Sequence, residues 1–458
     1  MTPPAVPPRP FGARFITPLL WGTSLNPINS SVIATSLVAI GAAFGVSAGQ
    51  TATLVAAVYV ASAVAQPAMG RLASQFGPRR VFLAGLVVVS AAGIVGAFAP
   101  DFTWLIASRA LIGVGTAAGY PTAMAMIRAR AETVGRGIPG GILGAISIAA
   151  QVTAALGLPL GGVLVAVWGW PAVFAVNTPL GVIGVLLTLV GVPPDGPRTR
   201  SSARELARAL DPVGMALFTA AVVALIGVLT DVRHPAWWLI ALFVLAVGAL
   251  VLWELRAHRP FIDVRMLAAN GPLVRTYLRQ ALTLMAAYTV LYGYVQWLEE
   301  GRGLGAGASG LVMLPMSAIA ALGAAVISRR AFVRGPLLIS AVAIVAGGAA
   351  MAFVDRTTDV TVLIGLSLVF GVVMGMNSTA NQAALYTQTS AADIGVASGL
   401  LRTASYLGAI FASALIGLAF PGRATDGGLH AAAWALVALG VGVLLLILAD
   451  RRLPSRGH

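Results

Sequence analysis

Polar side chains that could bind a ligand stand inside long apolar stretches of this chain. They are amides, tyrosines and arginines, which supply hydrogen-bond donors, acceptors and fixed positive charge. Polar groups inside such stretches normally turn toward a pathway or a neighbouring helix. The candidates for a substrate path are Asn26, Asn29, Tyr59, Gln66, Arg109, Tyr120, Gln151, Tyr288, Tyr292, Gln296, Asn377, Asn381, Gln382 and Arg402, with Arg279 beside them. For any single residue of this set, a role in holding two helices together is an equally good interpretation.

Titratable side chains avoid the interior of these stretches. All 15 acidic residues and all 4 histidines fall in expected loops, in the tail or at the ends of stretches. The chain has no cysteine, which excludes disulfides, thiol catalysis and thiolate metal sites. No His/Asp/Glu group has the spacing of metal ligands, and no constellation suits a membrane enzyme. We therefore expect no metal, no cofactor and no enzymatic activity.

The composition requires most of the chain to face an apolar environment. Of 458 residues, 58% are hydrophobic and 10% are charged, against roughly 25% charged in a soluble domain. A helix needs about 20 mostly apolar residues to span a bilayer. Fourteen stretches qualify: 16–43, 48–70, 81–100, 103–127, 138–166, 171–192, 212–230, 236–254, 272–297, 307–328, 336–354, 360–386, 394–420 and 429–449. The sequence thus predicts an all-α membrane protein of about 14 transmembrane helices.

Arginine supplies all 29 basic residues, and its placement predicts the orientation. With the N-terminus in the cytoplasm, 21 arginines fall in cytoplasmic segments and 4 in external ones, in accord with the positive-inside rule. The same rule accounts for the net charge of +14, so we expect no nucleic-acid partner. We expect a monomeric multi-pass protein of a bacterial plasma membrane, with both termini cytoplasmic and with lipid and a small molecule as partners.

Two polar segments divide the stretches into sets of six, two and six. The predicted organisation is a tail 1–15, a six-helix bundle 16–192, a linker 193–211, two additional helices 212–254, a linker 255–271, a six-helix bundle 272–450 and a tail 451–458. The bundles share weak similarity, because FGPRRVFL in the first and FVRGPLLI in the second both follow the second helix of their set. Parallel repeats are typical of transporters with two six-helix halves. Shared Gly/Ala composition is the alternative explanation.

Four motifs occur in order within the first six stretches. The loop 70–80, GRLASQFGPRR, resembles the signature Gly-x-Leu-Ala-Asp-Arg-x-Gly-Arg-Lys, and 105–115, LIASRALIGVG, resembles Leu-x3-Arg-x2-Gln-Gly-x-Gly. Residues 157–162, GLPLGG, resemble Gly-Pro-x2-Gly-Gly, and 170–181, WPAVFAVNTPLG, resemble Trp-Arg-Trp-Ile-Phe-x2-Asn-x-Pro-x-Gly. On these motifs the chain resembles the major facilitator superfamily, in its fourteen-spanner drug:proton antiporter branch.

The resemblance implies conformational roles for residues of these motifs. Their glycines and prolines would allow tight turns and close helix packing, and the two arginines that end the loop would hold the halves together on the cytoplasmic side. The charge relay of that loop is incomplete, because Ser74 replaces its acid. The residues with implied roles are Gly70, Gly77, Arg79, Arg80, Gly157, Pro159, Gly161, Gly162, Asn177 and Pro179.

The resemblance also implies export of drugs or small amphiphilic metabolites by alternating access, driven by protons. The branch carries Asp-x-Thr in its first span, whereas this chain has Asn29-Ser30-Ser31, and an amide cannot titrate. Glu299 and Glu300, at the end of the ninth stretch, are the nearest replacements, but solvated loop charges are the favoured interpretation of that pair.

Our hypothesis for coupling is facilitated transport, or coupling through the charge of the substrate or through a peripheral acid. All charges inside the stretches are arginines, which favours neutral or anionic substrates over cations. The alternative function on the same fold is a uniporter, importer or flippase for a neutral or anionic metabolite or lipid.

Overall fold

The structure is a computed structural model built from helices, and it describes residues 11–134, 140–196, 211–230, 236–257, 261, 264–330, 332–389, 394–450 and 453. The first part of the chain forms α1 (Ala13–Val32), a 3₁₀ turn (Ile33–Ser36), α2 (Leu37–Phe44), α3 (Ala48–Phe76), α4 (Pro78–Ala97), α5 (Phe102–Ala117), α6 (Gly119–Thr133), α7 (Gly140–Trp168), α8 (Pro171–Ala175) and α9 (Asn177–Gly191). The second part forms α11 (Pro212–Thr230), α12 (Trp237–Glu254), α13 (Val264–Ala269), α14 (Gly271–Tyr288), a π turn (Thr289–Tyr294), α15 (Val295–Glu300), α16 (Ala306–Arg330), α17 (Arg334–Met351), α18 (Val360–Gln388), α19 (Ile394–Ala419) and α20 (Asp426–Ala449).

Short polar caps begin several of these helices where the sequence leaves the apolar stretches. Asp101 accepts hydrogen bonds from the backbone of α5, and Asp359 does the same for α18. Ser47 and Gln50 form a reciprocal capping box at the start of α3. Each cap accepts hydrogen bonds from backbone N–H groups that have no partner within the helix. The cap therefore fixes where the helix begins, at the edge of an apolar run.

Twelve helices within the described part of the chain are long and apolar enough to cross a membrane. The other two predicted stretches are helical as well. The apolar run of α11 covers only Pro212–Val228, and α14 carries Arg275, Arg279 and Gln280, which lower its hydropathy. The prediction of an all-α membrane protein is confirmed, whereas the predicted count of fourteen spans is not supported, since twelve candidate spans are found among the described residues.

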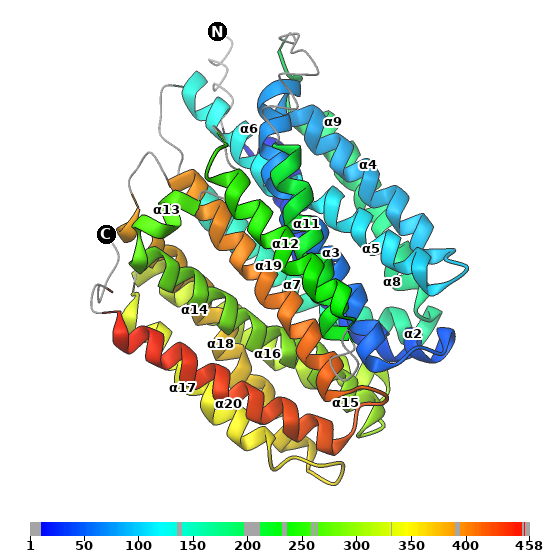
Figure 1. The fold of residues 1–458 in the computed structure, drawn as a ribbon. Coiled ribbons are helices and arrows are strands. Elements are labelled where there is room, and N and C mark those ends of the chain that lie inside the picture. The colour runs from blue at the N-terminus through cyan, green and yellow to red at the C-terminus, as the bar shows by residue number, and fades with distance from the viewer. Residues whose placement is uncertain are drawn as a thin grey trace.

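The helices pack as two groups that meet along a seam. We call α1–α9 the N-terminal half and α14–α20 the C-terminal half. The halves meet where α7 packs on α16 and α3 packs on α19. In Figure 1, α4, α5, α8 and α9 lie on one side of this seam, and α17, α18 and α20 lie on the other. Packing contacts between sequence-distant helices therefore bring residues of both halves to one central layer.

The two additional helices lie against the seam. Helices α11 and α12 pack on each other, and α11 contacts both α3 and α19 (Figure 1). Side chains of α12 such as Trp237 and Leu245 are exposed by 76% and 70%, as expected for a helix that faces lipid. Most of the predicted linker 193–211 and of the tails 1–15 and 451–458 lies outside the described residues, and part of the linker 255–271 forms α13.

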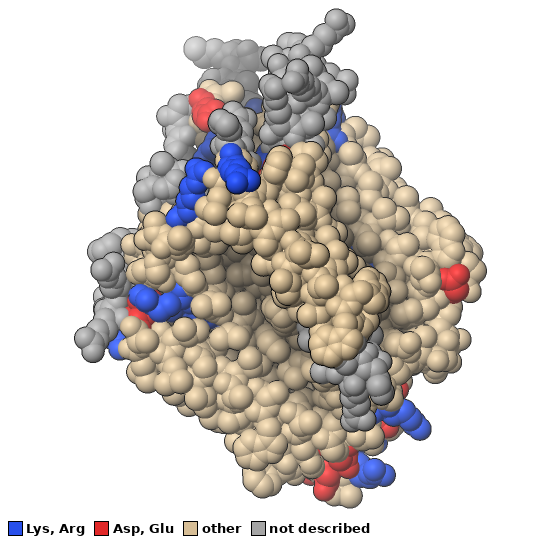
Figure 2. Space-filling view, in the orientation of Figure 1, with Lys and Arg blue, Asp and Glu red and all other residues tan. Residues whose placement is uncertain are grey.

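Charged side chains mark the two ends of the bundle. The start of α1 and the end of α20 lie at one end of the bundle, which we call the termini end, and the loop between α2 and α3 lies at the far end (Figure 1). On the face shown in Figure 2, Arg, Asp and Glu gather at these two ends, and uncharged side chains fill the band between them. This distribution is the one expected of a bundle that spans a bilayer.

Candidate functional site

A cluster of four tyrosines joins the halves in the central layer. Tyr59 of α3 and Tyr292 of the π turn share a hydrogen bond of 3.0 Å between their hydroxyl groups, and Tyr292 also contacts the carbonyl oxygen of Ser30 at 2.7 Å. The rings of Tyr288 and Tyr406 lie 5.2 and 5.8 Å from the ring of Tyr59. Because Tyr59 belongs to the N-terminal half and the other three belong to the C-terminal half, the cluster closes the seam.

Arg109 of α5 lies next to this tyrosine cluster, because its guanidinium bonds the carbonyl oxygen of Asn29 and Tyr292 bonds that of the following residue, Ser30. Its side chain is 1% exposed and turns toward α3 and α1, where Nε donates to the carbonyl oxygen of Leu54 at 3.2 Å and Nη1 to that of Asn29 at 3.4 Å. Nη2 is buried and has no hydrogen-bond partner among the described residues. A guanidinium held by carbonyl oxygens alone keeps its full charge uncompensated.

Asn26 and Asn29 of α1 differ in their hydrogen-bond partners. The amide of Asn29 donates to the carbonyl oxygen of Leu25 in its own helix at 2.9 Å, and the side chain is buried. Asn26 is half-buried and donates to Thr116 at 3.0 Å and Ser62 at 3.4 Å, across α5 and α3. Asn26 therefore faces the polar side of the N-terminal half, whereas the side chain of Asn29 faces its own backbone.

Further predicted residues cross the seam on either side of the tyrosines. Toward the termini end, Tyr406 donates to Gln66, and the guanidinium of Arg402 lies 3.7 Å from the ring centroid of Tyr120. Toward the far end, Gln296 donates to Thr51 at 3.4 Å. Gln382 instead bonds Tyr386 on its own helix, and the side chain of Gln151 lies outside what the structure describes. Seven of the fourteen predicted path residues therefore make contacts across one seam.

Asn377 and Asn381 lie away from the seam, in a polar network inside the C-terminal half. Asn381 accepts from Nε of Arg279 at 2.7 Å, and both asparagines donate to Oε1 of Gln280. Arg279 and Arg275 lie 3.8 and 3.1 Å from the carboxylate of Asp450, which is 0% exposed. Our sequence reasoning did not pick out Gln280 or the role of Asp450. The sequence did contain one indication of a buried acid. Arg275 and Arg279 lie four residues apart on one face of a helix, where two like charges repel each other unless an acidic side chain lies between them.

The signature loop uses an acid from a distant segment. Gly77 adopts a positive φ of 96°, and a Cβ there would lie 2.3 Å from the carboxylate of Asp195. Asp195 accepts from the backbone N–H groups of Arg79 and Arg80 at 3.1 and 2.9 Å, at the start of α4. The loop that lacks an acid at Ser74 is thus supplied with one from the segment after α9.

The side chains of Arg79 and Arg80 make contacts within the N-terminal half. Nη2 of Arg79 donates to the carbonyl oxygen of Leu189 at 3.3 Å, and Nη1 of Arg80 donates to that of Phe76 at 3.1 Å. In this structure both side chains therefore bond within the N-terminal half, onto α9 and α3, and the implied role of holding the two halves together stays a prediction.

Removal of the Asp195 carboxylate tests this capping role. We expect Asp195→Ala to lower the free energy of unfolding by about 1 kcal/mol, because two N–H groups at a helix start lose their acceptor. Unfolding in a sodium dodecyl sulfate titration, followed by tryptophan fluorescence, measures the change. Glu132→Ala, which removes an exposed acid inside α6, is the control and should change stability by less than about 0.5 kcal/mol. Equal effects would contradict the capping role.

The remaining motif residues lie at close helix contacts. A Cβ on Gly157 or Gly161 of α7 would meet Ser31 or Val32 of α1, and a Cβ on Gly162 would meet Ala306 of α16. Pro159 lies within α7, Pro179 lies in the first turn of α9, and Gly70 faces Pro121. Asn177 is 1% exposed and donates to carbonyl oxygens of Val173 and Phe174, which joins α8 to α9.

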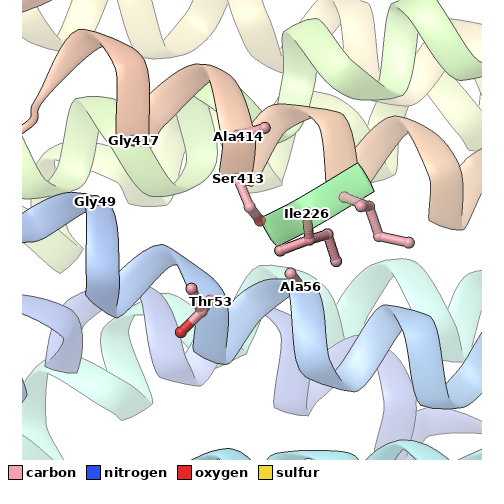
Figure 3. Close-up of a pocket in the computed structure, with 8 residues that line it drawn as sticks. Gly49, Thr53, Ala56, Ile226, Ser413, Ala414 and Gly417 are labelled. Atoms are coloured by element: carbon pink, nitrogen blue, oxygen red, sulfur yellow. The ribbon is translucent and has the colours of Figure 1, made fainter. Parts of the chain in front are cut away.

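A pocket opens on the α3–α19 side of the seam, next to α11. It is lined by small and apolar residues of α3, α19 and α11, among them Thr53, Ser413 and Ile226 (Figure 3). None of the predicted path residues lines this pocket. The polar central layer and this lateral pocket are therefore separate features.

Comparisons with known proteins agree with this architecture. The sequence model of the Major Facilitator Superfamily matches residues 19–413. The uncharacterized MFS-type transporter YwoD of Bacillus subtilis (strain 168) is 33% identical over 416 residues, which cover 89% of this chain and 90% of YwoD. The multidrug resistance protein Stp of Mycobacterium tuberculosis (strain CDC 1551 / Oshkosh) is 28% identical over 406 residues, which cover 85% of this chain and 72% of Stp. The crystal structure of a D-xylose-proton symporter, 15% identical, shares the fold with a TM-score of 0.65 over 96% of this chain and 98% of that chain.

Proposed function

Because the chain belongs to the Major Facilitator Superfamily, a family of membrane transporters, we propose that it exports drugs or small amphiphilic metabolites by alternating access. The similarity to a multidrug resistance protein supports export. The observation that carries the proposal is the tyrosine cluster of Tyr59, Tyr288, Tyr292 and Tyr406, where polar groups of both halves meet on the seam. Parting of the halves would expose these groups in turn to either end of the bundle.

We further propose that the protein is a fourteen-spanner, a monomer, and a resident of a bacterial plasma membrane with both termini in the cytoplasm. The proposal of fourteen spans draws its support from α11 and α14, which are helical over two further predicted stretches but are not among the twelve candidate spans. The arginine asymmetry supports the orientation, and the bacterial relatives support the location.

Expression in a bacterium that lacks its own efflux pumps tests the direction of transport. Export predicts that the minimal inhibitory concentration of several amphiphilic drugs rises on expression. The alternative function, a uniporter, importer or flippase for a neutral or anionic compound, predicts greater sensitivity or no change. The alternative draws its support from Asn29, since an amide at this position removes the usual acid of a proton-driven exporter.

Alternating access can be measured directly because the chain has no cysteine. Spin labels on Gln50→Cys with Arg423→Cys report the far end, and labels on Arg128→Cys with Thr387→Cys report the termini end; all four side chains are exposed. We expect the two distances to change in opposite directions. Distances that change together, or not at all, would reject the mechanism.

The tyrosine hydrogen bonds should hold the far end closed. Tyr292→Phe removes the hydroxyl that contacts Tyr59 and Ser30, so we expect the population open at the far end to rise about fivefold, since one net hydrogen bond contributes about 1 kcal/mol. The Gln50/Arg423 label pair measures this shift. Tyr294→Phe is the matched control, because its hydroxyl contacts Leu363 within the C-terminal half. If Tyr294→Phe raised the population open at the far end as much as Tyr292→Phe does, the hydrogen bonds of Tyr292 would not be what holds the far end closed.

A further inference from the structure

The positive charge of Arg109 has no counter-charge among the residues that the structure describes. Its guanidinium is 1% exposed, it bonds only the carbonyl oxygens of Leu54 and Asn29, and no acidic side chain forms an ion pair with it among the described residues. The buried Arg279 differs, because Asp450 lies 3.8 Å away. A buried cation without an acidic partner is costly, and ionisable groups within membrane-spanning helices often mark a substrate pathway.

Nη2 of Arg109 is the atom that such a ligand would meet. It is buried without a partner, next to the position where Tyr59 and Tyr292 close the seam. Tyr292 comes from the C-terminal half, so its hydroxyl leaves Tyr59 and Ser30 when the halves part at the far end. The hydroxyl group of Tyr59 is then a free donor beside Arg109, and a guanidinium together with a hydroxyl group suits a carboxylate.

The described charges in the central layer of the seam have one sign. Arg402, half-buried on Tyr120, is the second charge of that layer, and it is also positive. Glu299 and Glu300 end α15, which packs on α2 toward the far end of the seam, and the described acids Asp101 and Asp426 lie in a loop and at a helix start at that end. A site of this polarity attracts anions and repels the lipophilic cations that an acid-lined cavity would hold.

We propose that Arg109 anchors the carboxylate of an amphiphilic organic anion, and that the charge of this anion couples its export to the membrane potential. The inference rests on the proposed function and names its substrate class. Asn29 cannot carry a proton, which favours a driving force that comes from the charge of the substrate itself. A potential of about 100 mV, negative inside, favours outward movement of one negative charge by about fifty-fold at equilibrium. The anion itself carries the charge across, and no counter-ion enters the cycle.

The experiment compares a fluorescent carboxylate, dansylglycine, with its neutral amide, dansylglycinamide, in proteoliposomes of equal internal and external pH. Valinomycin and a potassium gradient make the lumen positive. We expect wild-type protein to accumulate dansylglycine up to about fifty-fold at about 100 mV and to equilibrate the amide without accumulation. A protonophore should change neither result. Protein-free vesicles give the background.

Arg109 variants assign the anion site. Arg109→Gln should weaken binding of dansylglycine at least tenfold and leave binding of the amide unchanged, whereas Arg109→Lys should keep part of the preference. Arg356→Gln removes an exposed arginine at the far end and should behave as wild type. The accumulation of dansylglycine at a set membrane potential is measured on the wild-type protein. It therefore tests the inference even if Arg109→Gln does not fold.

Three outcomes would overturn the inference: equal binding of acid and amide by the wild type, a preference that survives in Arg109→Gln, or accumulation that a protonophore abolishes. Absence of saturable binding of both probes would also overturn it. Different results would contradict the proposed function. These are an unchanged minimal inhibitory concentration on expression, and spin-label distances at the two ends that do not change in opposite directions.

Discussion

Replacement of Asp450 by alanine is expected to lower the free energy of unfolding by about 3–5 kcal/mol. Asp450 follows α20, is 0% exposed, and lies 3.1 Å from Nη2 of Arg275 and 3.8 Å from Nη1 of Arg279. Arg279 is also 0% exposed, so loss of the carboxylate leaves a buried guanidinium without its counter-charge. Sodium dodecyl sulfate titration, followed by tryptophan fluorescence, measures the loss.

An exposed ion pair at the far end is the matched control. Arg356 is 72% exposed where it meets Asp426, so Arg356→Ala should cost less than about 1 kcal/mol. Asp450→Asn keeps the shape and one acceptor, and an intermediate loss is expected. If Asp450→Ala and Arg356→Ala destabilise the protein equally, then the buried network around Arg279 does not hold the C-terminal half together.

This network shows which part of the site the sequence could predict. Polar residues within apolar stretches identified Arg279, Asn377 and Asn381 as inward-facing. Helical periodicity does not say which distant segment a residue meets, and Asp450 lies 175 residues from Arg275. An acid at the end of a predicted span looked solvated, but the packing of α20 on α14 buries it completely. Tertiary packing therefore decided the role of these residues.

The same distinction applies to the tyrosines and the fold. Hydropathy predicted the helices, because each must satisfy its backbone within the bilayer. The π turn at Thr289–Tyr294 and the hydrogen bond between Tyr59 and Tyr292, 233 residues apart, had no signal in hydropathy or spacing. The acid that serves the signature loop, Asp195, was also invisible, because the segment after α9 reaches it only in the folded chain.

Two adjacent glycines of α7 allow the fold and the transport cycle to be tested separately. We expect Gly161→Val to lower the free energy of unfolding by about 3 kcal/mol, since overpacking of a tight contact costs this much. A Cβ at Gly161 would lie 2.4 Å from the carbonyl oxygen of Val32 and 2.6 Å from Oγ1 of Thr35. The carbonyl belongs to the backbone of α1, so relief requires α1 and α7 to separate within the N-terminal half. Detergent titration measures the loss.

The same substitution one residue later should act on the seam instead. A Cβ at Gly162 would lie 2.7 Å from the carbonyl oxygen of Ala306 and 3.1 Å from Cα of Gly307, both in α16 of the other half. Gly162→Val should therefore lengthen the Gln50/Arg423 label distance and cost less stability than Gly161→Val. Gly365→Val, with no atom within 4 Å of its added Cβ, is the control. If Gly162→Val destabilised the protein as much as Gly161→Val and left the label distance unchanged, α7 would serve only the packing of its own half, and the seam between α7 and α16 would not be the contact that opens.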